Sequence, residues 1–197
     1  MVLTQKVNNL EGPRINLNEN LSPTQRAREG LTDVYLMPFY GFPESLAGAI
    51  AAKLSNDLKI NVRATPVLPI PENAFDTNRQ QYDANTFYKP EIDLACKLLD
   101  LNSQTAFIGL VRGSIFIQGI PARFVFACQF DPRFCLIGDY EMLSGADESL
   151  YHTRLYKMIK RQIGKAYYKK QPNSDENSLM KSPVMSTVDL DELSLDY

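Results

Sequence analysis

Apolar residues recur along the chain in two patterns, and these patterns predict its secondary structure. Unbroken apolar runs of about four to eight residues closed by Gly or Pro are typical of buried strands, whereas apolar residues at every fourth position indicate helices. The run VYLMPFYG at 34–41 has the first pattern. The stretch at 43–58 has the second, because it opens with Pro and Glu and then carries Leu or Ile at every fourth residue.

The rest of the chain continues to alternate between these patterns. We expect these further elements, in order: strand 59–68, long loop 69–85, helix 87–101, strand 105–113, a strand pair within 115–130 that turns near Gly119, strand 134–143 and helix 150–170. Strands interspersed with helices in this order predict a single α/β domain, with a mixed sheet and flanking helices.

Polarity divides the chain into three parts. Residues 1–30 form a polar, Asn-rich extension, residues 31–172 carry the predicted domain, and residues 173–197 form a polar C-terminal segment. The last ten residues, VDLDELSLDY, hold four carboxylate side chains and no cation. This acidic tail either stays solvated, folds back over a basic part of the chain or binds a basic partner.

Composition narrows the classes of protein. The chain has 197 residues, of which 44% are hydrophobic, enough for one domain with its own core. A net charge of −2 gives no overall attraction to nucleic acid or membrane. Three cysteines without a CxxC pair favour a reducing compartment. With no signal-peptide h-region and no apolar run of about 18 residues, we expect a cytoplasmic protein without a membrane span.

The predicted helix at 150–170 is strongly basic. From Arg154 to Lys170 it holds seven Lys and Arg residues and no acidic one. Arg161 and Lys165 lie within about 40° of each other around the helix axis, on the side opposite Ile163. One interpretation is a solvated basic face on an amphipathic helix.

A second interpretation comes from the segment AFDTNRQQYDAN at 74–85. Arg79, Gln81, Tyr82 and Asp83 match the R-x-Q-Y-[DN]-A segment, and this part of the chain resembles the archaemetzincins, compact zinc peptidases. The resemblance extends to the opening strand and helix, to FVFACQF at 124–130, to strand 134–143 as the edge strand of the family's cleft, and to helix 150–170 as its active-site helix. It implies a metzincin-like fold. Arg79, Gln81 and Tyr82 either tie the long loop to the sheet by hydrogen bonds to backbone, which we expect, or contact a ligand.

The resemblance also explains the spacing in the basic helix. Active archaemetzincins carry HExxHxxGxxHC, in which three His residues bind zinc and the Glu activates the bound water. Aligned with this string, the five named positions hold Arg161, Gln162, Lys165, Tyr168 and Gln171, and Pro172 replaces the Cys. Arg and Lys are cations and Gln is no general base, so no catalytic residue, metal ligand or cofactor is expected. Met180 or Met185 would supply the family's methionine turn.

The two cations at the degenerate positions suggest three roles. They pair with an internal carboxylate such as Asp139, Glu141 or Asp83 and close the old cleft. Alternatively, Arg161 and Lys165, with Tyr168, bind an anion or a peptide carboxylate. In the third case they are simply solvated.

Other chemistry has weaker support. His152, the only histidine, together with Cys128 and Cys135, would form a His/Cys/Cys metal set or an activated thiol. Tyrosines among the cations would stack nucleic-acid bases. These tyrosines are Tyr151, Tyr156, Tyr167 and Tyr168. Buried thiols, a surface histidine and packed tyrosine rings are the plainer interpretation.

The sequence therefore predicts a metzincin-like protein without zinc peptidase activity that holds a protein or peptide partner. The first alternative is an enzyme of another class that uses the remodelled cleft, a Cys hydrolase or a transferase acting on an anionic substrate. The second is a nucleic-acid binder that uses the basic helix.

Overall fold

The fold is built around a five-stranded sheet. The structure, a computed structural model, describes residues 22, 30–98 and 100–197, so nearly all of the predicted extension 1–30 lies outside the described residues. The strand order is β2-β1-β5-β8-β7. The four neighbours β2, β1, β5 and β8 are parallel, and β7 runs antiparallel to β8. Their bounds are β1 Thr32–Pro38, β2 Val62–Ala64, β5 Leu101–Val111, β7 Ala127–Gln129 and β8 Phe134–Gly138.

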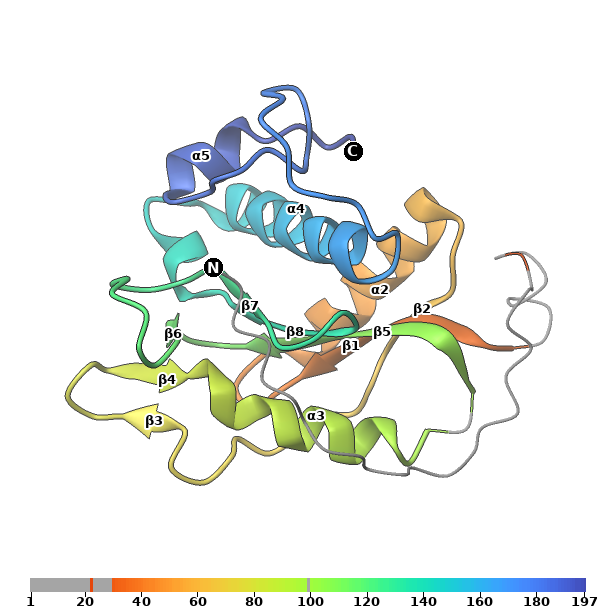
Figure 1. The fold of residues 1–197 in the computed structure, drawn as a ribbon, viewed down its shortest axis with the longest axis horizontal. Helices are drawn as coiled ribbons and strands as arrows, with labels where there is room; N and C mark the ends of the chain where they lie inside the picture. Colours follow the sequence, from red (N-terminus) through yellow and green to blue (C-terminus); the bar gives the residue numbers. More distant parts are fainter. Residues whose placement is uncertain (1–21, 23–29, 99) are drawn as a thin grey trace.

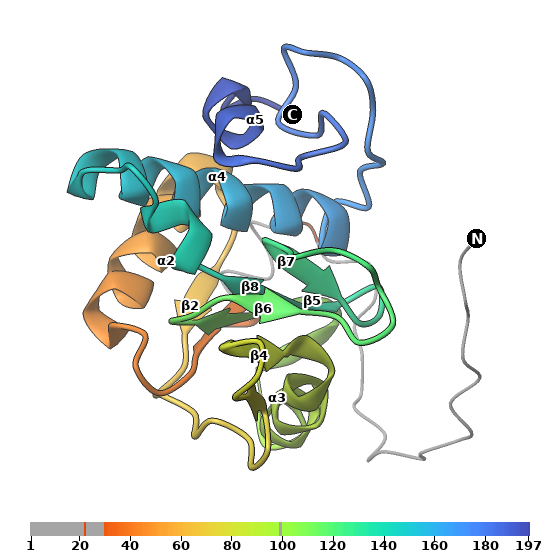
Figure 2. The same cartoon turned by 90° about the vertical axis from the view of Figure 1, so that its left-hand side faces the viewer.

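Helices cover both faces of this sheet (Figure 1). Helices α2 (Glu44–Leu58) and α4 (Glu148–Ala166) pack on one face, and α3 (Tyr88–Ala95) packs on the other (Figures 1 and 2). The short α5 (Thr187–Glu192) lies on the outer side of α4. The prediction of a mixed α/β domain with flanking helices is confirmed. None of the helices that the structure describes is long and apolar enough to cross a bilayer.

The buried strands explain the unbroken apolar runs. On β1, Val34 and Leu36 face the core under α2 and α4, while Tyr35 and Met37 face the cluster around α3. A parallel strand covered on both faces needs apolar residues at successive positions.

The predicted loop at 69–85 contains two of the three strands of a second sheet, so the prediction of a loop throughout was wrong. Strands β3 (Phe75–Asp76), β4 (Gln81–Asp83) and β6 (Ile115–Phe116) pair in the order β3-β4-β6. The Asp76 carboxylate accepts hydrogen bonds from the amides of Asn78 and Arg79 and so reverses the chain between β3 and β4. Strands β3 and β4 are only two and three residues long and include polar residues, which hides them from a search for apolar periodicity.

The strands expected in 115–130 belong to two different sheets. Strand β6 joins the small sheet and β7 joins the large one, and an antiparallel bridge between Ile115 and Val125 links them. Gly119, with a φ of 83°, lies in the turn between them. The predicted strand 134–143 ends at Gly138, and a 3-10 helix, Tyr140–Leu143, follows.

Two helix boundaries also differ from the prediction. Helix α3 ends at Ala95 rather than at 101, and β5 begins directly after Asp100. The Asp100 carboxylate accepts hydrogen bonds from Thr32 Oγ1, Tyr35 Oη and Arg63 Nη1 at 2.5, 2.5 and 2.8 Å. Helix α4 begins at Glu148, where Asp147 caps it by accepting from the Leu150 amide, and ends at Ala166.

The acidic tail folds back over the basic helix, one of the three arrangements considered above. Arg154 of α4 donates to both Asp191 carboxylate oxygens, at 2.7 and 2.6 Å. A Cβ on Gly164 would lie 2.6 Å from the Tyr197 ring and 3.0 Å from Met180 Sδ, so α4 and the C-terminal segment are in close contact. The C-terminal segment therefore covers much of the basic face of α4, which differs from the interpretation of a solvated face.

Candidate functional site

A cleft lies between the second half of α4 and strand β7. Its volume is about 390 Å³, and we call it the α4–β7 cleft. It is lined by Met158, Arg161, Gln162 and Lys165 of α4, by Ile120, Ala122 and residues 124–127 beside β7, and by residues 182–185. A second hollow of about 420 Å³ continues it past Lys165. Its lining comprises Gln129, Asp131, Pro132, Lys165, Lys169, Lys170, Gln171 and Pro172.

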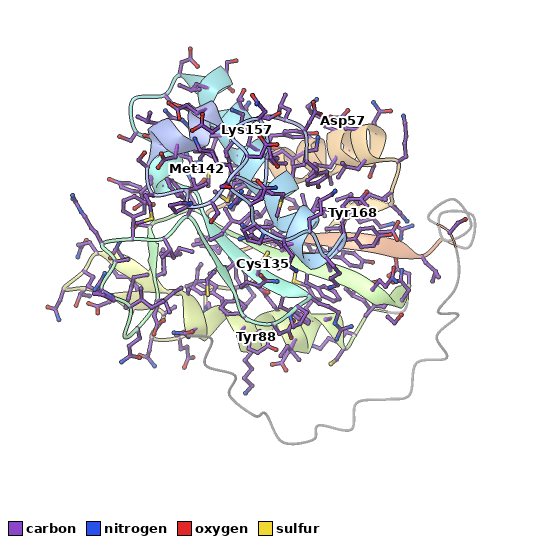
Figure 3. The ribbon with its side chains drawn as sticks, turned by 45° about the horizontal axis from the view of Figure 1, so that its top comes forward. Asp57, Tyr88, Cys135, Met142, Lys157 and Tyr168 are labelled. Atoms are coloured by element: carbon purple, nitrogen blue, oxygen red, sulfur yellow. The ribbon has the colours of Figure 1, made fainter. Side chains whose placement is uncertain are left out.

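The structure brings four of the five residues that align with the zinc-peptidase string to the α4–β7 cleft and the adjoining hollow. Arg161, Gln162 and Lys165 line the cleft, and Gln171 lines the adjoining hollow. Tyr168 does not join them. Its ring contacts Tyr167 and Tyr197, and it lies at the end of α4 beside Leu58 of α2 (Figure 3). The turn after α4 has its positive φ at Lys169, one residue after the position that aligns with the family's glycine.

Arg161 is buried in the floor of the cleft. It is 4% exposed, and its Nη1 donates to the Leu179 carbonyl at 2.5 Å. Burial lowers the pKa of its guanidinium. Among the described residues no carboxylate pairs with it.

The carboxylates proposed as partners of the two cations are engaged elsewhere. Asp139 accepts from Arg112 and from Tyr151, Glu141 accepts from Ser114, and Asp83 accepts from the Asn85 amide at the start of the 3-10 helix Ala84–Phe87. The expected internal ion pair is therefore absent between these groups.

Lys165 stands beside Arg161 as a second cation. No other side chain or backbone group in the part of the chain that the structure describes forms a hydrogen bond or ion pair with its ammonium group. Burial and then the charge of Arg161 lower the pKa of Lys165. The floor of the cleft thus holds two like charges that burial and mutual repulsion both disfavour.

These residues do not fit a zinc ion. Zinc ligands in proteins are thiolates, imidazoles and carboxylates, and the three positions that align with the zinc ligands hold two cations, Arg161 and Lys165, and one amide, Gln171. Across residues 30–98 and 100–197, no three His, Cys, Asp or Glu side chains are placed to share a metal ion. His152 lines a separate groove between α2 and α4.

The thiols are not activated either. Cys128 and Cys135 are buried within the sheet, and burial raises the pKa of Cys128 to about 12. Burial likewise raises the pKa of Cys135, which lies beneath α4 (Figure 3). A nucleophilic cysteine needs a lowered pKa, so neither position suits thiol catalysis.

The edge strand that flanks the cleft is β7, not the predicted strand at 134–143. Phe126 accepts from the Gly138 amide at 3.1 Å, and Phe130 donates to the Phe134 carbonyl at 2.9 Å. Pairing in an antiparallel ladder alternates, so the amides and carbonyls of Ala127 and Gln129 point away from β8. No strand of the described residues pairs with β7 on that side. Side-chain patterns carry no signal for such free backbone groups, so this part of the site was missed from the sequence.

The segment that suggested the resemblance has a structural role. Arg79 Nε donates to Gln81 Oε1 at 3.0 Å, and Gln81 Nε2 donates to Ser114 Oγ at 2.7 Å and to the Arg123 carbonyl at 2.9 Å. Tyr82 packs its ring edge-on against Phe75 and Phe87. Through these contacts the hairpin holds the chain that leads into β7.

The two candidate methionines lie in different places. Met180 is buried under Gly164 of α4, whereas Met185 is 71% exposed at the rim of the cleft. Met180 is thus the methionine that underlies the helix, as a methionine turn would require.

Comparison with known proteins identifies the fold of the chain. No family model matches the chain, and no curated protein matches it by sequence. Among solved structures, archaemetzincin from Methanopyrus kandleri is similar, with a TM-score of 0.68 and 20% identity over 86% of this chain and 91% of that one.

Two further structures agree. Archaemetzincin from Archaeoglobus fulgidus, solved with malonate, has a TM-score of 0.64 and 19% identity over 83% of this chain and 94% of its own. A zinc-dependent peptidase from Methanocorpusculum labreanum has a TM-score of 0.64 and 19% identity over 82% and 93%. The sheet order, the antiparallel edge strand and these likenesses together show that the chain has the archaemetzincin fold.

Proposed function

We propose that this chain is a metzincin-fold protein without zinc peptidase activity that binds a protein or peptide segment in the α4–β7 cleft. The observation that carries the proposal is the unpaired backbone edge of β7, which lies beside a cleft whose lining includes the cations Arg161 and Lys165. The residues that align with the zinc ligands are Arg161, Lys165 and Gln171, and none of them is a zinc ligand in proteins. The fold does not depend on a metal for its core, which lies between the sheet and its helices.

An extended segment would bind by adding a strand to the sheet. The free N–H and C=O groups of Ala127 and Gln129 lie beside the cleft, and a peptide that pairs with them extends the sheet by one strand. The strand edge is free only after Val125, whose amide donates to the Ile115 carbonyl. By the same hypothesis the protein works in the cytoplasm, where its three free cysteines stay reduced.

Absence of zinc is the first prediction. The purified protein is expected to contain far less than one zinc per chain after dialysis without chelator, because cationic side chains repel Zn²⁺. Elemental analysis by mass spectrometry measures this, with turnover of a fluorogenic peptide library measured in parallel. Stoichiometric zinc, or peptide hydrolysis that a chelator abolishes, would contradict the proposal.

A matched pair of substitutions at Gln129 tests strand addition. The probes are two fluorescein-labelled nonapeptides, GTEVEVETG and its glutamine counterpart GTQVQVQTG, with binding followed by fluorescence anisotropy. Gln129→Pro removes an amide that points away from β8, so the fold tolerates it while the added strand loses a donor. We expect binding of whichever probe binds the wild type to weaken about tenfold.

Gln129→Ala is the control, because it removes the side chain but keeps the amide. It is expected to bind like the wild type. If Gln129→Ala and Gln129→Pro weaken binding equally, or if the wild type binds neither probe, strand addition at β7 is wrong.

A further inference from the structure

The cations of α4 differ in the groups that they bond to, and one of them, Arg154, is bonded to a carboxylate. From Arg154 to Lys160 they bond to the C-terminal segment: Arg154 to the Asp191 carboxylate, Lys157 to the carbonyls of Leu190 and Asp191, and Lys160 to the Leu195 carbonyl. Figure 3 shows Lys157 on the side of α4 that faces this segment.

From Arg161 to the turn after α4, the described residues bond no carboxylate to the cations. Arg161 donates to the Leu179 carbonyl, Lys169 donates to the carbonyls of Pro132 and Ala166, and Lys170 lies over the Tyr197 ring. Lys165 has no such contact among the described residues. Among the described residues, the C-terminal segment therefore bonds a carboxylate to Arg154 and none to the cations from Arg161 to Lys170.

The linings of the two hollows show the same imbalance. Among the residues that the structure describes, the lining of the α4–β7 cleft includes Arg161 and Lys165 and no Asp or Glu. From the same described residues, the adjoining hollow adds Lys169 and Lys170, against a single acid, Asp131. Asp131 is already engaged by the Tyr88 hydroxyl and by the amides of Arg133 and Phe134. In a chain of net charge −2, this concentration of cations favours an anionic ligand.

We propose that the ligand of the cleft is an acidic extended peptide whose carboxylates, on alternate residues, pair with Arg161 and Lys165. This inference rests on the proposed function and specifies its ligand. Side chains two apart on a strand are separated by about 6.6 Å, and residues four apart on a helix by about 6 Å along its axis. Arg161 and Lys165 are four apart, so a peptide strand on β7 presents successive carboxylates to both.

Arg161 suits the binding of a carboxylate because its guanidinium is buried and most of its N–H donors have no hydrogen-bond partner among the described residues. One of its five N–H donors is bonded, to Leu179, and a guanidinium binds a carboxylate through two parallel hydrogen bonds. A carboxylate at this point also offsets the repulsion between Arg161 and Lys165.

The shape of the cleft favours a peptide over a nucleic acid. Apolar side chains line much of it, among them Phe124, Phe126 and Val184, and its guanidinium lies at the floor rather than on an open face. A slender carboxylate side chain reaches that floor, and the free amides of β7 match the alternating pattern of a peptide backbone.

The test compares the two nonapeptides with each other and across variants at low salt. The wild type is expected to bind GTEVEVETG about tenfold to a hundredfold more tightly than GTQVQVQTG, as charge-assisted hydrogen bonds require. Lys165→Gln, at a side chain without a bonding partner among the described residues, is expected to remove most of that preference. Arg161→Gln is the second variant, with circular dichroism to confirm that both remain folded.

Lys53→Gln is the matched control. It removes the same charge from an exposed position on α2, outside both hollows, and is expected to leave the preference unchanged. Equal binding of the two peptides by the wild type would overturn the acidic ligand while leaving strand addition intact. Binding of neither peptide would contradict the proposed function itself.

An oligothymidylate of nine nucleotides forms the third arm. If it displaces GTEVEVETG at equal concentration and loses affinity in Lys165→Gln, the cleft is a nucleic-acid site and the peptide proposal is wrong. We expect no displacement.

Discussion

Replacing Glu91 with methionine is expected to raise the free energy of unfolding by about 2–4 kcal/mol near pH 7. Glu91 lies on α3 against the sheet and is 0% exposed. Neither of its carboxyl oxygens has a hydrogen-bond partner among the described residues. Gly109 of β5 makes the room for it, since a Cβ there would collide with Glu91 Oε1. Methionine has a similar length and carries no group that loses hydration on burial.

The same residue is expected to make stability depend on pH. Burial raises the pKa of Glu91 well above its ordinary value. Below about pH 4.3 the carboxyl is protonated in the folded and unfolded chains alike, so it imposes no ionisation cost. As the pH rises above this value, Glu91 ionises in the unfolded chain before it ionises in the folded chain. The free energy of unfolding therefore falls with pH until the pH reaches the raised pKa of Glu91 in the folded chain.

Urea unfolding between about pH 5 and about pH 8 measures this effect. The difference in stability between Glu91→Met and the wild type should grow with pH. Glu91→Gln is the matched control, because it cannot ionise but remains polar, so it should flatten the pH profile with a smaller gain in stability. A wild type whose unfolding free energy changes with pH in parallel with Glu91→Met would contradict the argument.

Asp191→Ala is expected to lower the free energy of unfolding by about 2–3 kcal/mol. Arg154 is almost fully buried and links three segments, because it donates to the Asp191 carboxylate and, through Nη1, to the carbonyls of Met142 and Ser144. Removing the carboxylate leaves a buried guanidinium without its counter-charge. The loss stays below that of a fully buried pair because the Asp191 side chain is 33% exposed.

The control for Asp191→Ala is a substitution at the next residue of α5, Glu192. Glu192 pairs with Lys181 at 3.5 Å, but its side chain is 60% exposed, so Glu192→Ala should change stability by less than about 0.5 kcal/mol.

The Arg154 hydrogen bond lowers the pKa of Asp191, so the contribution of Asp191 to stability is present above about pH 3.9 and is lost as the pH falls through the lowered pKa. Asp191→Ala and the wild type should therefore converge in strong acid. Equal effects of Asp191→Ala and Glu192→Ala near neutral pH would show that the C-terminal segment is not held by Arg154.

The large sheet and its helices were predictable from the sequence because burial on both sides imposes a pattern. Val34 to Met37 must all be apolar when α2 lies on one face of β1 and α3 on the other. The hairpin of β3 and β4 was not predictable in this way, since it depends on the carboxylate of Asp76 and on polar residues that look like a loop.

The site was only partly predictable for a different physical reason. Helical spacing placed Arg161 and Lys165 on one side of α4, but it could not reveal that the C-terminal segment buries that helix. Nor could it assign the edge of the sheet to β7, because that depends on which strand lies outermost and not on any side chain.

The short free edge of β7 also determines how long a complex would last. The Ile115–Val125 bridge closes the edge at one end and the turn into β8 closes it at the other, so only Ala127 and Gln129 offer backbone groups. Two donors and two acceptors, each contributing about 0.5–1.5 kcal/mol net, cannot hold a peptide for long by themselves. A ligand that docks here alone would dissociate quickly, and a lasting assembly would require a partner that presents several such segments and gains avidity from linking them.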